Sequence, residues 1–167
     1  MENDMLRKRL FLIPVLALAL SSCANNSADL VQISLAPIPY VFEVPSDIAK
    51  RLTIENMELE VGNDFNSQFT QQAKQAGAIA QMYINYTADD GSVHGFAGVY
   101  YFKKADFETA QNPNEPPIYG SKVVGENEMV LAIAGPQDSI FEPTTQDGKN
   151  VSALYTLVYD PKSFKYS

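Results

Sequence analysis

Histidine and cysteine are almost absent from this sequence, which has one of each among its 167 residues, and tryptophan is missing altogether. A single cysteine has no partner for an intramolecular disulfide, so the fold has to be stabilised by its hydrophobic core. The common zinc sites use several histidine or cysteine ligands, so the sequence excludes a site of that kind. His94 would have to act alone, and we expect it to be an ordinary hairpin residue rather than a general base or a metal ligand.

Positive charge is also scarce. The chain has 12 Lys and Arg residues against 20 Asp and Glu residues, which gives a net charge of −8. Nucleic-acid binding depends on cations that neutralise phosphates, so we expect no nucleic-acid partner for a chain this acidic. The nucleophile elbow, the phosphate-binding loop and the dinucleotide fingerprint are absent as well. These absences exclude the enzyme classes that carry such motifs, and we expect no cofactor.

The N-terminal segment has the order of features found in a secretory signal peptide. Residues 7–9 are all cationic, and the apolar run of residues 10–20 follows them. That run is too short for a transmembrane helix, which needs about 20 residues. Glu2 and Asp4 are unusual at such a position, so Met5 is an alternative start of the chain.

The apolar run ends in Leu20-Ser21-Ser22-Cys23, which resembles the lipobox of bacterial lipoproteins. In that family an aliphatic residue and small residues precede a cysteine, whose thiol accepts a diacylglycerol. The resemblance implies that residues 1–22 are a signal peptide and that Cys23 anchors the chain to a membrane. The alternatives are an ordinary secretory signal with an accidental cysteine and a buried helix with a free thiol. Ala24 replaces the aspartate that favours the inner membrane, so the outer membrane is favoured in a Gram-negative source.

Removal of residues 1–22 would leave a chain of the size of one ordinary domain. The removed segment holds three cationic and two acidic residues, so the remainder would have a net charge of −9. We expect residues 23–36 to be the lipidated cysteine and a tether, and residues 37–167 to be a single globular domain. The acidic surface would keep this domain soluble and away from anionic lipid, in the cell envelope.

Alternating apolar residues and turn signals predict an α+β domain with a mainly antiparallel sheet of five to seven strands and helices on one or both faces. Two aromatic-rich runs around Asp90-Gly91 are typical of a β-hairpin. The apolar run 129–134 is typical of a strand buried on both faces. The other expected elements are a proline-bracketed edge strand over 40–45, a helical turn at 46–49, a bulged strand or two short strands within 51–61, a helix over 65–77, a short helix or turn over 103–111, irregular structure over 112–119, a strand at 123–124, and a terminal helix over 150–160 that buries Val151, Leu154, Tyr155 and Val158.

Three stretches resemble a group of uncharacterised bacterial lipoproteins and secreted domains with a PsbP-like fold. They are Phe42-Glu43-Val44-Pro45, the strand and helix of residues 98–107, and the strand, acidic loop and helix of residues 130–159. The tryptophan that is common near the first strand of such domains is missing here. The resemblance implies an α/β/α sandwich, and it implies a ligand-binding or assembly module rather than an enzyme.

The loop expected after the apolar strand is the first candidate for a functional site. It covers residues 138–148 and holds the carboxylates Asp138, Glu142 and Asp147, with Phe141 as an apolar residue in an exposed segment. Paired carboxylates can perform acid–base chemistry or bind a hard cation. A solvated acidic loop without such a role is the alternative.

We expect a non-catalytic module of the cell envelope that is tethered by the lipid on Cys23 and binds a ligand or an envelope protein. The tether, the acidic surface, the tyrosine-rich sheet and the absence of a catalytic motif favour this function. Two alternatives remain open. One is a hydrolase that uses the carboxylates of residues 138–147 with His94, and the other is a cation-binding module.

Overall fold

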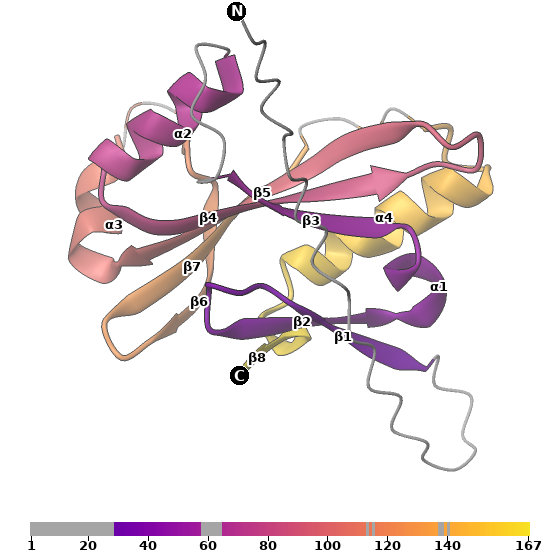
Figure 1. Ribbon diagram of the computed structural model, residues 1–167, viewed down its shortest axis with the longest axis horizontal. Helices are drawn as coiled ribbons and strands as arrows, with labels where there is room; N and C mark the ends of the chain where they lie inside the picture. The colour runs from indigo at the N-terminus through magenta and orange to yellow at the C-terminus, as the bar shows by residue number, and fades with distance from the viewer. Residues whose placement is uncertain (1–28, 58–64, 113, 115, 137–138, 140) are drawn as a thin grey trace, which may run out of the picture.

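The computed structural model describes residues 29–167, apart from 58–64, 113, 115, 137, 138 and 140 (Figure 1). The expected signal peptide, Cys23 and Asp138 lie outside the described residues. Within these residues the chain forms two antiparallel sheets and four α-helices, so the α+β class is confirmed. The strands are divided between a sheet of five and a sheet of three, where the sequence suggested a single sheet.

The five-stranded sheet is built around a long hairpin. Strands β4 (Ala78–Thr87) and β5 (Val93–Lys103) pair as predicted, through a turn in which the Gly91 N–H donates to the Ala88 carbonyl at 3.0 Å. The other strands are β3 (Leu52–Asn56) beside β4, β7 (Met129–Ala134) beside β5, and β6 (Ser121–Glu126) beside β7, which gives the order β3-β4-β5-β7-β6.

Strand β7 is covered on both faces. Leu131 and Ile133 belong to one hydrophobic core, whereas Val130 and Ala132 belong to the other, and each is at most 1% exposed. Successive side chains of a strand point to opposite faces, so a continuous apolar run is what such a position requires. The prediction of a strand buried on both faces is confirmed.

The small sheet consists of β1 (Leu30–Ser34), β2 (Tyr40–Pro45) and β8 (Phe164–Tyr166). The prediction of an edge position for residues 40–45 is wrong, because β1 and β8 pair with β2 on its two sides. Pro39 and Pro45 flank the strand at its ends, where a missing N–H costs no central ladder bond. The fold also begins earlier than residue 37, since β1 and the fully buried Leu35 lie in the segment expected to be a tether.

The helices pack on the two faces of the large sheet (Figure 1). Helices α2 (Phe65–Gln75) and α3 (Lys104–Ala110) cover one face, where they contribute Ala73 and Phe107 to the core. Helix α4 (Gln146–Val158) and the small sheet cover the other. The expected helical turn is α1 (Ser46–Ala49). No helix of the described residues is long and apolar enough to span a bilayer.

Helix α4 begins four residues before the predicted start. Thr145 is its N-cap, with an Oγ1 that accepts the Gly148 N–H at 3.0 Å. Gly148 suggested a loop, but the helix requires a small residue there, because a methyl group would lie 2.1 Å from the Glu142 carbonyl oxygen. Asp147 therefore belongs to the first turn of α4. The sequence did not predict the two short elements that follow α4, a 3-10 helix over Pro161–Ser163 and strand β8.

Candidate functional site

The candidate residues of the acidic loop do not converge on one site. Phe141 is half-buried, Glu142 is exposed, and Asp147 is part of α4. Asp138 lies outside the described residues. Of the two cavities described below, neither is lined by Glu142, Asp147 or His94. Neither of these two cavities therefore brings two of these groups together on a substrate.

The Asp147 carboxylate holds two parts of the fold together. One oxygen accepts a hydrogen bond from the Tyr86 hydroxyl at 2.7 Å, and the other accepts one from the Asp89 backbone N–H at 3.0 Å. The Arg51 guanidinium lies 3.6 Å away and also pairs with the Asp89 carboxylate. The hydrogen bond from Tyr86 is the main cause that lowers the pKa of Asp147. A carboxylate with a lowered pKa and two engaged oxygens is a weak base.

Tyr86 extends this contact into the interior. Its side chain is 1% exposed, and its hydroxyl oxygen accepts a hydrogen bond from the Asn150 amide at 3.1 Å. The Gln146 amide in turn donates to the Asn150 side-chain oxygen at 2.8 Å. Burial is the main cause that raises the pKa of Tyr86, and the hydrogen bond to Asp147 adds to it. This network joins β4 to the first turn of α4 and has a structural role.

His94 belongs to a short polar chain at the start of β5. The Ser92 hydroxyl oxygen lies 2.5 Å from an Asp90 carboxylate oxygen and 2.7 Å from His94 Nε2. Hydrogen bonds from Ser92 lower the pKa of Asp90, so Asp90 is ionised at neutral pH. An ionised carboxylate can only accept, so Ser92 donates to Asp90 and the imidazole N–H donates to Ser92. His94 is then not placed to take a proton from Ser92, which disfavours a Ser–His nucleophile pair.

Phe141 packs against the same hairpin. Its ring lies edge-to-face on His94 and on Tyr86, at centroid distances of 5.2 and 5.8 Å. The part of the loop that follows is held by the Glu142 carbonyl, which accepts a hydrogen bond from the Thr145 hydroxyl at 2.7 Å. In the described parts of the chain, no group of three His, Cys, Asp or Glu residues could hold a metal ion. These residues therefore fix the loop and supply no metal-binding arrangement.

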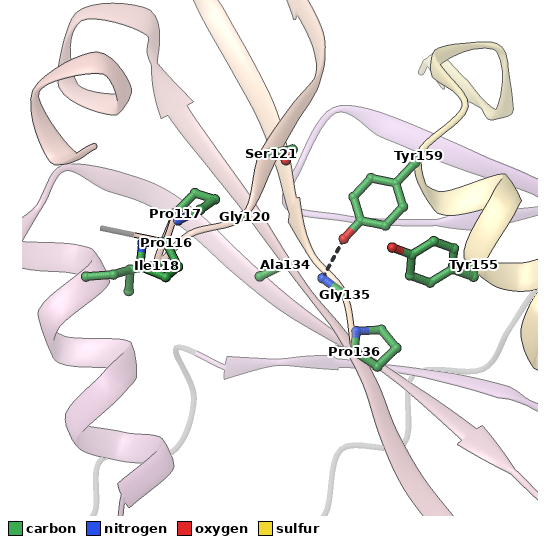
Figure 2. Close-up of a pocket in the computed structure, with 10 residues that line it drawn as sticks. All are labelled: Pro116, Pro117, Ile118, Gly120, Ser121, Ala134, Gly135, Pro136, Tyr155 and Tyr159. Carbon is green, nitrogen blue, oxygen red and sulfur yellow. Dashed lines mark hydrogen bonds between the residues drawn. The ribbon is translucent and has the colours of Figure 1, made fainter. Parts of the chain in front are cut away.

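The larger of the two concave surfaces lies at the end of β7. It is a groove of about 600 Å³ between the turn before β6 and the C-terminal end of α4. Residues 134–136 form its floor, with Tyr155 and Tyr159 on one side and residues 116–118 on the other (Figure 2). Gly120 and Ser121 complete the lining. We call this surface the Pro–Tyr groove.

Two tyrosines give the Pro–Tyr groove its shape. The Tyr159 hydroxyl oxygen accepts a hydrogen bond from the Gly135 N–H at 2.9 Å, which fixes its ring (Figure 2). The Tyr155 ring lies one helical turn earlier, with centroids 5.1 Å apart and planes inclined by 58°. Tyr155 is 48% exposed and Ile118 is 50% exposed, so the groove presents apolar surface to solvent. Exposed apolar surface beside a concavity is typical of a binding site.

The Pro–Tyr groove is uncharged although the chain is acidic. None of its ten lining side chains carries a charge or an amide, and the side-chain hydroxyls of Ser121, Tyr155 and Tyr159 are its polar groups. Such a surface can contact apolar rings and donate hydrogen bonds. It lacks the cations that phosphates require and the carboxylates that metal ions require.

No known protein family, curated protein or solved structure matches this chain. The role of the groove therefore has to be inferred from its own residues.

A second cavity, of about 470 Å³, lies between α1 and the first turn of α4. Its lining mixes charges of both signs, and its Arg51 is already paired with Asp89. Because it is smaller and its Arg51 is already engaged outside the cavity, it is the weaker candidate. Its lining residues are Asp47, Lys50, Arg51, Gln146 and Asn150.

Sequence reasoning missed the Pro–Tyr groove. It assigned Tyr155 to the buried face of the terminal helix, which is wrong, because Tyr155 is half-exposed whereas Leu154 and Val158 are fully buried. One signal was available: Tyr155 and Tyr159 are four residues apart and so share a helix face. The prediction of irregular structure over 112–119 agrees with the described residues of that segment, but nothing there indicated which part of the fold it meets.

Proposed function

We propose that this protein is a lipid-anchored, non-catalytic module of the bacterial cell envelope that binds a partner in the Pro–Tyr groove. The groove is the observation that supports this function best, since it combines exposed aromatic surface with the absence of charge. Tyrosine is common at such sites because it joins an apolar ring to a hydroxyl that can hydrogen-bond. The hydrolase and cation-binding alternatives have no comparable arrangement among the described residues.

The proposed anchor would hold the domain close to the membrane. Residues 24–29 separate Cys23 from the first strand residue, and six extended residues reach at most about 20 Å. The Asp29 carbonyl accepts a hydrogen bond from the Ser46 N–H at 2.8 Å. This bond ties the start of the fold to α1.

The Pro–Tyr groove would lie at a distance from that attachment point. Helix α1 and the first turn of α4 line the same cavity, whereas the groove is lined by the other end of α4. An α-helix of 13 residues is about 20 Å long, so roughly that distance separates the two ends. We propose that the groove is directed toward an envelope protein beyond the membrane surface.

The substitution Cys23→Ser tests the anchor. The unchanged protein should sediment with membranes, on a density gradient with the outer membrane in a Gram-negative host, and should incorporate an alkyne-labelled fatty acid. The Cys23→Ser variant should do neither, because a lipid-anchored protein without its acyl chains loses its stable membrane attachment. An Asn25→Ser variant is the control and should keep the label. Label on the Cys23→Ser variant, or none on the unchanged protein, would contradict the anchor.

Site-specific photo-crosslinking in intact cells tests the groove. A photoreactive phenylalanine is placed at Tyr155 or Ile118 in the groove, or at Val93, which is 62% exposed in the β4–β5 hairpin. We expect an adduct of defined mass at the two groove positions and none at Val93. Equal adducts at all three positions, or none at the groove positions, would contradict the proposed function.

A further inference from the structure

We infer that the cavity between α1 and the first turn of α4 binds a small zwitterion, a free amino acid or a dipeptide, through its ammonium and carboxylate groups. We call this site the α1–α4 cavity, and its lining residues are Asp47, Lys50, Arg51, Gln146 and Asn150. It is separate from the Pro–Tyr groove, so the inference goes beyond the proposed function. Two unpaired charges of opposite sign and two ordered amides in the lining favour this class of ligand.

The α1–α4 cavity has one carboxylate and one ammonium group that the fold does not use. Asp47 lies in α1 and Lys50 is the C-cap of that helix, and both residues are exposed. They form no ion pair with each other or with any other residue in the part of the chain that the structure describes. Opposite charges three residues apart on a helical turn often pair. Here each of the two charges stays available to a ligand.

Arg51 contributes less to the charge of the cavity, because its guanidinium is engaged elsewhere. It pairs with the Asp89 carboxylate and lies 3.6 Å from that of Asp147, and these two groups compensate its charge. Asp47 and Lys50 are therefore the charges that the cavity offers, one of each sign. A ligand with no net charge that carries both signs is complementary to them.

The two amide side chains supply hydrogen-bonding groups at fixed positions. Asn150 is 7% exposed, and its amide donates to the Tyr86 hydroxyl at 3.1 Å while its oxygen accepts from the Gln146 amide at 2.8 Å. A primary amide has two N–H donors, so each of these amides keeps one N–H that no described residue accepts. The Gln146 side-chain oxygen also has no partner among the described residues. An N–H suits a ligand carboxylate, and an amide oxygen suits a ligand ammonium group.

Other ligand classes fit this lining less well. The volume of about 470 Å³ is within the usual range of small-ligand sites, about 300–1,000 Å³. A simple anion would be repelled by Asp47 and a simple cation by Lys50, so each would gain one attraction at the cost of one repulsion. An apolar ligand would bury charged groups without partners, which is unfavourable. A neutral saccharide would bond to the amides but would leave both charges uncompensated.

Isothermal titration calorimetry of the full-length protein in mild detergent tests the class of ligand. The probes are the common L-amino acids, each in turn, and the dipeptide alanyl-alanine, and we expect saturable binding of at least one. For the probe that binds best, the N-acetyl derivative lacks the ammonium charge and the amide derivative lacks the carboxylate charge. Each derivative should bind about tenfold more weakly, because it loses a charge-assisted hydrogen bond. Absence of binding by every probe, or derivatives that bind as well as the parent, would overturn the inference.

Charge-neutral variants assign the binding to the α1–α4 cavity. Asp47→Asn should weaken the best probe about tenfold and should bind that probe and its N-acetyl derivative equally, because the partner of the ammonium group is gone. Lys50→Gln should remove the preference over the amide derivative in the same way. Both residues are exposed, so the melting temperature should change little. Glu55→Gln and Lys122→Gln, exposed on β3 and β6, are the matched controls and should change nothing.

The remaining outcomes decide between this inference and its competitors. Unchanged binding by both Asp47→Asn and Lys50→Gln would overturn the assignment to the cavity. Preferential binding of phosphoethanolamine, the headgroup of a zwitterionic phospholipid, would replace the amino acid with a lipid. Glucose that binds as well as the best amino acid would overturn the charged class. Tyr155→Ala, in the Pro–Tyr groove at the other end of α4, should leave the titration unchanged, so the proposed function is tested separately.

Discussion

The Tyr86 hydroxyl donates a 2.7 Å hydrogen bond to Asp147, which lies 61 positions later in the chain. This contact joins the hairpin strand β4 to the first turn of α4. The same hydroxyl oxygen accepts from Asn150, so one buried phenol satisfies two partners on the helix. An aspartate that the sequence marked as a candidate for chemistry therefore positions a helix.

The substitution Tyr86→Phe should destabilise the fold. It leaves the Asn150 amide without its acceptor and removes the donor from Asp147, and an unsatisfied buried group costs about 1–3 kcal/mol in the free energy of unfolding. Urea denaturation followed by circular dichroism measures this loss. Tyr166→Phe is the matched control, because that side chain is 63% exposed. Equal stabilities of the two variants would show that the network contributes nothing.

Acid should weaken the contribution of Asp147. Its pKa is lowered in the fold, mainly by the hydrogen bond from Tyr86. The ionised form is therefore stabilised in the folded state, and this stabilisation is present above the unfolded pKa of about 3.9 and is lost as the pH falls through the lower folded value. Asp147→Asn should be less stable than the unchanged protein at pH 7, and the difference should shrink below about pH 4.

Urea denaturation between pH 7 and pH 3 measures this pH dependence. Glu142→Gln removes an exposed carboxylate of the loop before α4 and serves as the control, with a much smaller change expected. A difference between Asp147→Asn and the unchanged protein that stays constant with pH would refute the electrostatic role.

Removal of the α4 N-cap should also be measurable. Thr145→Ala deletes the side-chain acceptor of the Gly148 N–H and should cost about 1 kcal/mol in the free energy of unfolding. Thr144→Ala, one residue earlier and exposed, should cost much less. Thermal or urea denaturation distinguishes the two. If the Thr144 variant lost as much stability, the capping role of Thr145 would have to be abandoned.

Two glycines with positive φ provide a matched pair. Gly91 has a φ of 83° and open space around it, so Gly91→Ala should cost only the backbone strain of about 1–2 kcal/mol. Gly120 has a φ of 73°, and a methyl group there would lie 1.8 Å from the Ile133 carbonyl oxygen. Gly120→Ala should therefore cost more than about 4 kcal/mol or prevent folding. Similar melting temperatures for the two variants would disprove the close approach of Gly120 to β7.

Regular elements with a strong period were predictable from the sequence. The strand β7 is apolar at every position, as a two-sided core needs, the hairpin β4–β5 has two aromatic-rich runs around a turn signal, and α2 carries the four-residue spacing of a helix. The three residues of β8 are too few to show any period. The sequence also could not predict that β2 is paired on both sides. Its second partner is β8, which is too short to recognise and comes from the far end of the chain.

The site was less predictable than the fold. The Pro–Tyr groove is formed by the segments 116–121, 134–136 and 155–159, which no sequence window contains together. Asp147 was predicted as a site residue because acidic side chains can perform chemistry. Whether a carboxylate is available for chemistry depends on its hydrogen-bond partners in the fold, and these cannot be read from the sequence. Tyr155 looked like a core residue because its neighbours Leu154 and Val158 are, and only the position of α4 on the sheet shows that its ring emerges at the groove.

The pairing of β1 has a mechanical consequence if Cys23 carries the anchor. β1 is an edge strand, and its first residue Leu30 pairs with Pro45 at the end of β2. A pull on the lipid loads that end first, so the ladder bonds of β1 would break one after another rather than together. Release of residues 29–35 would then add up to about 25 Å to the free tether. The small sheet would thus open first under load and lengthen the tether. The five-stranded sheet under the groove would stay intact.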